Sequence, residues 1–231
     1  MKDLSQQTVG QIVADDYRAA QIFRARGLDF CCGGKKTLAS VCKAKNIEVN
    51  EVLQDLSIIS QAETDQHNYN DWTLDFLAEY IIQNHHSFVR KMLPELNFYA
   101  EKVARVHGES HPELLEILEK VKQLSYELVD HLEKEEEDLF PQIKELVKEQ
   151  KSGSVKEALL EILESEHEKA GELMAEIESL TNNFTPPEGA CASYRVLFQN
   201  LEGFQKDLHK HVHLENNILF PKALDFEKRL N

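Results

Sequence analysis

HLEKEEEDLFP at residues 131–141 is matched 80 residues later by HVHLENNILFP at residues 211–221, so the chain carries the pattern H-x-x-x-E-x-x-x-L-F-P twice. Residues four positions apart project from one face of an α-helix. Each copy therefore directs one imidazole and one carboxylate towards the same point, from His131 and Glu135 and from His211 and Glu215. The repeat predicts two long helices that present metal-binding side chains to a shared interior.

A second, weaker repeat lies upstream of each copy. His86 precedes His131 by 45 residues, and His167 precedes His211 by 44 residues. The chain thus holds a single histidine followed by a histidine–glutamate pair, twice. Four imidazoles and two carboxylates on four helices suit a pair of non-haem iron ions, because these side chains together favour Fe, Mn or Zn.

The predicted metal centre is an open one. Glu135 and Glu215 can each bridge two metals, while four histidines supply two terminal nitrogens per metal. Each ion then has fewer than six protein ligands, which leaves room for small diatomic molecules. One such pair alone is common on solvated helix faces, so the prediction depends on the duplication. Burying these carboxylates without a cation would be costly.

The composition indicates a helical protein with a sizeable core. The 231 residues are 42% hydrophobic but include only 9 glycines and 6 prolines, which leaves long stretches for helices. The net charge of −15 argues against nucleic acid and against an anionic membrane surface as partners. No signal peptide or membrane span is evident, and four cysteines do not form a secreted disulfide framework. We therefore expect a cytoplasmic protein with reduced thiols.

The chain divides into two predicted parts. Residues 1–60 predict a small helical domain, in which TVGQ at 8–11 fits a capping box, Thr37 and Asn50 fit N-caps, and Gly27 fits a helix end. Residues 61–70 are polar and aperiodic, which predicts a linker. Residues 71–231 predict four long helices.

The four predicted helices have recognisable starts and stops. The first runs to about residue 107 with a kink at Pro94, and Gly108 is a stop signal. Capping boxes, SHPE at 110–113 and SVKE at 154–157, open the second and third, and TPPE at 185–188 precedes the fourth. Short connections favour an up-down-up-down four-helix bundle, so the predicted fold class is all-α.

The other histidines and acidic residues are expected to lie outside the metal centre. His85 points about 100° away from its neighbour on a helix. The run 133–138 is predicted to be a solvated face except for Glu135, and the Leu-Phe-Pro segments to pack and kink the helix. Glu164 has an E-x-x-H spacing to His167 but no counterpart at position 83, so we expect it next to the ligands or on the surface. The remaining histidines with this expectation are His107, His111, His209 and His213.

Two adjacent cysteines, Cys31 and Cys32, precede two glycines in a loop predicted to be flexible and exposed. Two interpretations stay open: a redox or metal-transfer dithiol that approaches the iron site, or a turn built from small residues. Cys42 and Cys191 are predicted to be buried thiols.

Four segments together resemble a known family, the bacterial repair-of-iron-centres proteins, which are di-iron proteins for repair of iron–sulfur clusters. LDFCCGGKKTL at 28–38 resembles the family's short N-terminal domain. EHEKAGEL at 166–173, TNNFTPPEGAC at 181–191 and LENNILFP at 214–221 resemble its hemerythrin-like domain. The resemblance covers nearly the whole chain and implies a hemerythrin-like bundle preceded by a small Cys-Cys domain.

The resemblance also implies a metal site and a function. It places two non-haem irons in an oxo-bridged centre held by His86, His131, Glu135, His167, His211 and Glu215. It implies a cytoplasmic protein, induced by oxidative or nitrosative stress, that helps to restore damaged clusters by donating iron, handling NO, or both. The expected partners are iron–sulfur proteins with damaged clusters and the diatomic molecules NO and O2; whether the protein forms a homodimer stays open.

Alternative functions belong to other classes. A NO-binding or NO-reducing protein would be recognised by whether it consumes NO catalytically, so whether the protein is an enzyme stays open. A hemerythrin-like O2 carrier or sensor fits less well, because such carriers use an additional histidine and have no use for a Cys-Cys domain. An iron-free scaffold would require the duplicated pattern to be a coincidence.

Overall fold

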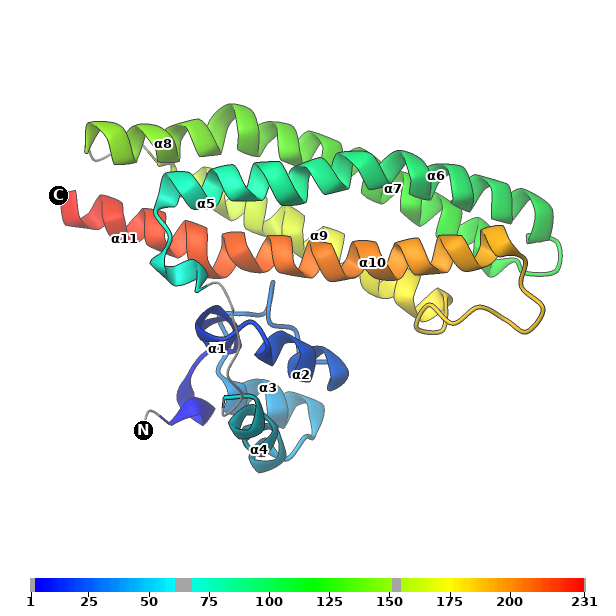
Figure 1. Cartoon of the computed structure of the whole chain (residues 1–231), viewed down its shortest axis with the longest axis horizontal. Coiled ribbons are helices and arrows are strands. Elements are labelled where there is room, and N and C mark those ends of the chain that lie inside the picture. The colour runs from blue at the N-terminus through cyan, green and yellow to red at the C-terminus, as the bar shows by residue number, and fades with distance from the viewer. Residues whose placement is uncertain (1–2, 61–67, 151–154, 231) are drawn as a thin grey trace.

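The structure, a computed structural model, describes residues 3–60, 68–150 and 155–230. Figure 1 shows a cluster of short helices packed against the side of a long helical bundle. Within the described residues the regular elements are helical, apart from one isolated bridge between Thr8 and Thr37. The predicted all-α class, a bundle preceded by a small helical domain, is confirmed. Among the described helices, we find none with the length and apolarity needed to cross a lipid bilayer.

The N-terminal part consists of short helices: η1 (Leu4–Gln6), α1 (Val9–Asp15), α2 (Ala19–Ala25), α3 (Leu38–Lys45) and α4 (Val49–Ser60). The capping box at Thr8 is confirmed, since its hydroxyl accepts from the Gln11 N–H at 3.2 Å and the Gln11 side chain accepts from the Thr8 N–H at 3.3 Å. Thr37 caps α3 as predicted. The prediction that Asn50 is an N-cap is wrong, because Asn50 lies inside α4. The helix expected to end at Gly27 is two helices, broken after Asp15.

Four helical arms form the bundle (Figure 1). Three of them contain a π-helical turn. The first arm is α5 (Leu74–Tyr80), η3 (Ile81–His86) and α6 (Ser87–His107); the second is α7 (Glu113–Lys134), η4 (Glu135–Leu139) and α8 (Phe140–Glu149). The third is α9 (Glu157–Leu180) alone, and the fourth is α10 (Ala192–Leu214), η5 (Glu215–Leu219) and α11 (Phe220–Leu230).

Consecutive arms run antiparallel, as the predicted up-down-up-down topology requires. Pairs of contacts show this, because residue numbers rise along one arm as they fall along the next. The pairs are His86–Glu136 and Asn97–Ser125, Lys120–Glu176 and Lys134–Glu166, and His167–Asn216 and Glu178–Gln205. α10 also packs against α6, which closes the bundle.

Several predicted helix signals differ from the structure. α7 begins at Glu113 without a side-chain cap, so the box predicted at Ser110 is wrong. The box at 154–157 begins on a residue outside the described ones, and α10 begins at Ala192, four residues past TPPE. Pro94 lies inside α6, and the first arm departs from α-helical geometry in η3 instead.

The core consists of two apolar clusters on either side of the histidines. One contains the inner faces of α6, α7 and α10 together with Phe23 and Phe30 from the N-terminal part. The other contains α5, α8 and α11 and includes the Leu-Phe segments at 139–140 and 219–220, whose predicted packing is confirmed. Burial of this apolar surface stabilises the bundle and holds the polar residues between the clusters in place.

The predicted division into residues 1–60, 61–70 and 71–231 remains a prediction. Most of the predicted linker lies outside the described residues. Its last residues enter the short helix η2 (Tyr69–Asp71), where Tyr69 is buried. Between the first and second parts, the apolar cluster that contains Phe30 continues into the bundle through Leu208 and Val212.

Candidate metal centre

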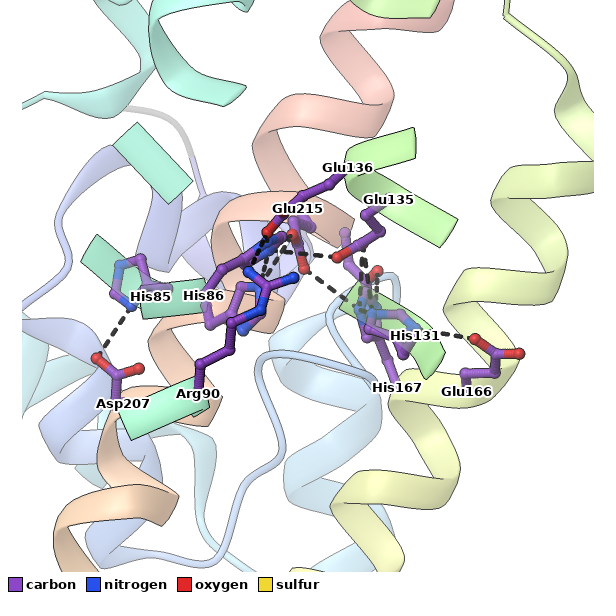
Figure 2. A network of polar contacts seen from close by, with 12 residues as sticks. His85, His86, Arg90, His131, Glu135, Glu136, Glu166, His167, Asp207 and Glu215 are labelled. Atoms are coloured by element: carbon purple, nitrogen blue, oxygen red, sulfur yellow. Dashed lines mark hydrogen bonds and ion pairs between the residues drawn. The ribbon is translucent and has the colours of Figure 1, made fainter. Parts of the chain in front are cut away.

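The structure brings together all six residues singled out in the sequence. They form two groups that share both glutamates: His86 and His211 with Glu135 and Glu215, and His131 and His167 with the same two glutamates. Within each group the candidate ligand atoms all lie within 4.8 Å of one another, and all six side chains are buried. Figure 2 shows the side chains of His86, His131, Glu135, His167 and Glu215 converging from different helices.

Each glutamate reaches both groups. The Oε2 atom of Glu135 lies 3.4 Å from His86 Nε2, and its Oε1 atom lies 3.4 Å from His131 Nε2. The Oε1 atom of Glu215 lies 3.0 Å from His211 Nε2, and its Oε2 atom lies 3.2 Å from His167 Nε2. Each carboxylate thus spans two pairs of imidazoles, which is the geometry of a bridging ligand.

The π-helical turns determine where these side chains point. η3 ends at His86, η4 begins at Glu135, and η5 begins at Glu215. Such turns insert extra backbone into an α-helix and are frequent at functional sites. In η4 and η5 the turn is followed by the Phe-Pro pair of the repeat; the expected kink therefore takes the form of a π-helical turn, which suits a proline that lacks an N–H.

Outer hydrogen bonds hold three of the four imidazoles. Nδ1 of His86 lies 2.7 Å from Glu136 Oε1, and Nδ1 of His131 lies 2.9 Å from Glu166 Oε2 (Figure 2). Nδ1 of His167 lies 2.8 Å from Asn216 Oδ1. Such partners fix the tautomer with hydrogen on Nδ1 and leave the Nε2 lone pair free for a metal.

The centre has a donor set that fits cations. His131 Nε2 and His167 Nε2 are 2.8 Å apart, and His86 Nε2 and His211 Nε2 are 3.1 Å apart. Two lone pairs at these distances repel unless a proton or metal ion lies between them. Among the described residues, neither oxygen of Glu135 accepts a hydrogen bond of good geometry. Buried carboxylate oxygens without donors are costly, and bound cations relieve that cost.

The charges of the centre are strongly coupled. Burial opposes protonation of His86 and His131, but contacts with the buried glutamates raise the pKa of each to about 10. Burial and the charge of Glu215 oppose ionisation of Glu135, but the histidines lower its pKa to about 2. Burial lowers the pKa of His211. Without metal, protons therefore occupy part of the space between the carboxylates, and metal binding has to displace them.

Comparisons with known proteins agree with this geometry. Residues 77–223 match the hemerythrin HHE cation binding domain, and residues 5–59 match ScdA_N, a domain of unknown function. Iron-sulfur cluster repair proteins YtfE of Yersinia pestis and of Yersinia pseudotuberculosis are each 38% identical to this chain over 225 residues, which covers 96% of this chain and 98% of the relative. This chain belongs to the hemerythrin-like iron–sulfur cluster repair family. The resemblance read from the sequence is confirmed.

Several residues around the centre have roles that the sequence pattern does not predict. Glu136, expected on a solvated face, bonds His86 and is paired with Arg90 at 2.6 Å. Glu166 bonds His131 and is paired with Lys134 at 2.5 Å. Burial favours the neutral form of Glu136, but Arg90 stabilises its charge and the pKa is lowered overall. Hydrogen bonds from His131 and then Lys134 lower the pKa of Glu166 to about 2.

Two phenylalanines of the repeat also have roles beyond core packing. Phe140 stacks on His86 with ring centroids 5.5 Å apart, and Phe220 stacks on His167 at 6.2 Å. Each Leu-Phe-Pro segment therefore supports a histidine on a different arm. The position of each phenylalanine, nine residues after the repeat's histidine, was visible in the sequence, but the ring that it contacts depends on tertiary structure.

The other residues expected to lie outside the metal centre are mostly found there. His85 belongs to neither group; its Nδ1 lies 3.0 Å from Asp207 Oδ1. Glu164 pairs with Lys35 of the N-terminal part at 2.6 Å. Cys42 is buried as predicted, but Cys191 is exposed, so the prediction for Cys191 is wrong. Cys191 stands at the N-cap position of α10 without a capping side-chain hydrogen bond, and its thiol lies 3.3 Å from His107 Nε2. The other described histidines in neither group are His107, His111, His209 and His213.

The Cys-Cys loop lies against the centre rather than in solvent. Cys31 is buried and Cys32 half-buried, which corrects the expected exposed loop. Their sulfur atoms are 3.9 Å apart, and the Cys32 thiol donates to the carbonyl oxygen of His167 at 3.5 Å. The Cys32 thiol and burial raise the pKa of Cys31 well above its usual range. Both thiols are free.

Proposed function

We propose that His86, His131, Glu135, His167, His211 and Glu215 hold two iron ions per chain, bridged by both glutamates, and that the protein repairs iron–sulfur clusters by supplying iron. The observation that carries this proposal is the sharing of Glu135 and Glu215 by the two buried groups. The relatives' name, iron-sulfur cluster repair protein, supports the cluster as the target. When bound, such ions supply Lewis acidity and exchangeable coordination positions.

The chain's own residues explain how iron can be both held and released. Outer partners orient three imidazoles, and the buried glutamates supply the negative charge that attracts cations. The same glutamates hold protons on His86 and His131 when metal is absent. Protons and iron would therefore compete for the same buried positions, and these side chains would take up protons when iron leaves, so that no buried charge stays unpaired.

We assign Cys31 and Cys32 to the transfer of iron. Thiolate is a ligand for iron in cluster proteins, and these two thiols lie against the arm that carries His167. Because the pKa of Cys31 is raised, its thiol is protonated at rest, and binding of a metal ion would release that proton. The two thiols would therefore bind iron in exchange for a proton.

Handling of NO is the second candidate function. Each group has four protein donors, two of them shared with the other group, which would leave coordination positions for a diatomic molecule; an oxo bridge between the ions would occupy one more. The experiment that separates the two functions compares stoichiometric with catalytic behaviour. Under repair by iron supply, reactivation of a damaged dehydratase consumes protein-bound iron; under NO reduction, the reduced protein removes NO over many turnovers without losing iron.

The test of the leading proposal is reactivation of a damaged [4Fe–4S] dehydratase by iron-loaded protein. Iron-loaded wild type is expected to restore activity, and the Glu135→Ala/Glu215→Ala double variant is not. Glu133→Ala is the matched control, because Glu133 is an exposed acidic residue in the same run as Glu135. Reactivation by the double variant equal to that of wild type would reject iron supply from this centre.

A further inference from the structure

Asn217 connects the candidate metal centre to the N-terminal part. It lies in η5, two residues after Glu215 and directly after Asn216, which bonds His167. Its side chain points away from the centre, and its amide nitrogen donates to the carbonyl oxygens of Phe30 at 3.2 Å and Cys31 at 3.1 Å. One π-helical turn thus carries a candidate ligand, a partner of a second one, and a contact to the Cys-Cys loop.

The loop that Asn217 contacts is a preformed unit. The carboxylate of Asp29 accepts the backbone N–H groups of Cys31, Cys32 and Gly33 at 3.0, 3.1 and 2.8 Å. The loop is also joined to the start of α1, where the N–H of Gly10 donates to the carbonyl oxygen of Gly34 at 2.9 Å. A contact at Phe30 and Cys31 therefore positions the whole loop, both thiols included.

Two glycines make room for Asn217. A Cβ atom at Gly10 would lie 2.2 Å from Asn217 Oδ1, and one at Gly34 would lie 2.1 Å from the same oxygen. Real Cβ atoms do not approach so closely, so any larger residue would move the asparagine or separate the two parts. Neither glycine has the positive φ that favours glycine. A Cβ atom at Gly10 would also lie 2.9 Å from the carbonyl oxygen of Gly34, and one at Gly34 would lie 2.8 Å from that of Phe30, so both glycines allow the close approach of Asn217 and of the loop backbone.

Another polar link between this loop and the bundle is weaker. Lys35 and Glu164 form an ion pair at 2.6 Å, but the Lys35 side chain is 72% exposed. Exposed pairs contribute little, because water and salt screen them. Asn217, in contrast, is half-buried and donates to two backbone carbonyl oxygens of the loop.

We propose that Asn217 is a positioning residue that docks the Cys31–Cys32 loop onto the metal centre and so holds Cys32 at His167. The proposal rests on the proposed role of the dithiol in iron transfer. It adds that the turn which carries Glu215 also sets the place of the acceptor thiols. The amide nitrogen of Asn217 contacts Phe30, Cys31 and, at 3.3 Å, Nδ1 of His213, and none of these residues belongs to either candidate metal group.

The test measures alkylation of Cys31 and Cys32 by iodoacetamide in the iron-loaded full chain, followed by mass spectrometry. Asn217→Ala is expected to raise the alkylation rate about tenfold, the effect of losing two hydrogen bonds of ordinary strength. Iron content and the optical spectrum of the centre are expected to stay those of wild type. Iron transfer to a metal-free cluster acceptor should nevertheless slow. Slower transfer with unchanged iron content is a combination that a merely structural role would not produce.

Asn84→Ala is the matched control. Asn84 also lies in a π-helical turn two residues from a candidate ligand, His86, but its amide donates to the carbonyl oxygen of Tyr80 in its own arm at 2.9 Å. Its removal should leave the alkylation rate unchanged.

Two results would overturn the proposal: an alkylation rate in Asn217→Ala equal to that of wild type, or loss of iron in Asn217→Ala, which would place its role in the centre itself. Failure of iron transfer as a function is a separate outcome. In that case Cys31→Ser/Cys32→Ser transfers iron normally, while Asn217→Ala still exposes the thiols.

Discussion

The thiol of Cys32 donates a hydrogen bond to the main-chain carbonyl oxygen of His167 at 3.5 Å, although 135 positions separate the two residues. This contact joins the two domain families that the chain contains, one of unknown function and one that binds cations. Because His167 belongs to a candidate metal group, the dithiol lies next to the centre without being one of its ligands. A loop in this place suits the transfer of metal to or from the bundle.

The contacts of Glu135 and Glu215 with both groups predict a graded mutational pattern. Glu136→Ala removes the outer partner of His86 and should weaken iron binding by about 10- to 100-fold. Glu135→Ala and Glu215→Ala should each lose more iron than that, because each removes a carboxylate that contacts both groups. Glu133→Ala should match wild type. Iron per chain, measured by elemental analysis under limiting iron, checks the order; equal losses in all four variants would reject it.

The sequence was sufficient to predict which six side chains converge, because the key spacing is local. The i,i+4 relation of His131 to Glu135 and of His211 to Glu215 holds within one helix, whatever the helix packs against. The bundle followed from the same repeat. Helix starts were predicted less well, since α7 and α10 begin without the side-chain caps that a local pattern would reveal.

What the sequence could not reveal depends on tertiary structure. Glu136 stands in an acidic run that looks solvated, and only the approach of η3 makes it a partner of His86. Asn216 and Asn217 are consecutive amides, yet one bonds His167 within the bundle and the other bonds Phe30 across to the N-terminal part. The sequence alone does not show which of two adjacent amides faces the bundle interior and which faces the N-terminal part, because that depends on the packed helices around them.

The two halves of the centre should release iron at different rates. Among the described residues, Nδ1 of His211 has no hydrogen-bond partner, whereas His86, His131 and His167 each have one. Outer partners raise the basicity of a histidine ligand. The ion held by His86 and His211 should therefore be removed first, and chelation followed by absorbance should show two phases.

Asn216→Ala tests this asymmetry. It removes the outer partner of His167 and should speed the slower phase by about 10- to 100-fold, while leaving the faster phase nearly unchanged. Asn84→Ala serves again as the control. If Asn216→Ala accelerates the fast phase instead, the assignment of the labile ion to His86 and His211 is wrong.

The metal-free protein should lose stability in alkaline solution. The pKa of His86 and of His131 is raised to about 10 in the folded state, above the ordinary value of 6.5. Their contribution is fully present below pH 6.5 and is lost as the pH rises through 10. The pKa of Glu135 is lowered to about 2, so its contribution is present above 4.5 and lost as the pH falls through 2.

Thermal unfolding of the metal-free chain between pH 6 and 10 checks this prediction. The midpoint temperature should fall as the pH rises, and iron loading should remove most of the fall, because bound metal replaces the protons. His111→Ala, at a histidine outside both groups, should leave the profile unchanged. A flat profile for the metal-free chain would contradict the proton-filled interior.

The dithiol should be dispensable for holding iron but needed for delivering it. Replacing Cys31 and Cys32 by Ser keeps the size of both side chains and the backbone contacts of the loop to Asp29 and Asn217. Iron content and the optical spectrum should therefore match wild type, since neither sulfur belongs to a candidate metal group. Reactivation of a damaged dehydratase should fall to the level reached by free ferrous iron. Cys42→Ser, at a buried thiol remote from the loop contacts, is the control, and unchanged reactivation by the double variant would leave the loop with a docking role alone.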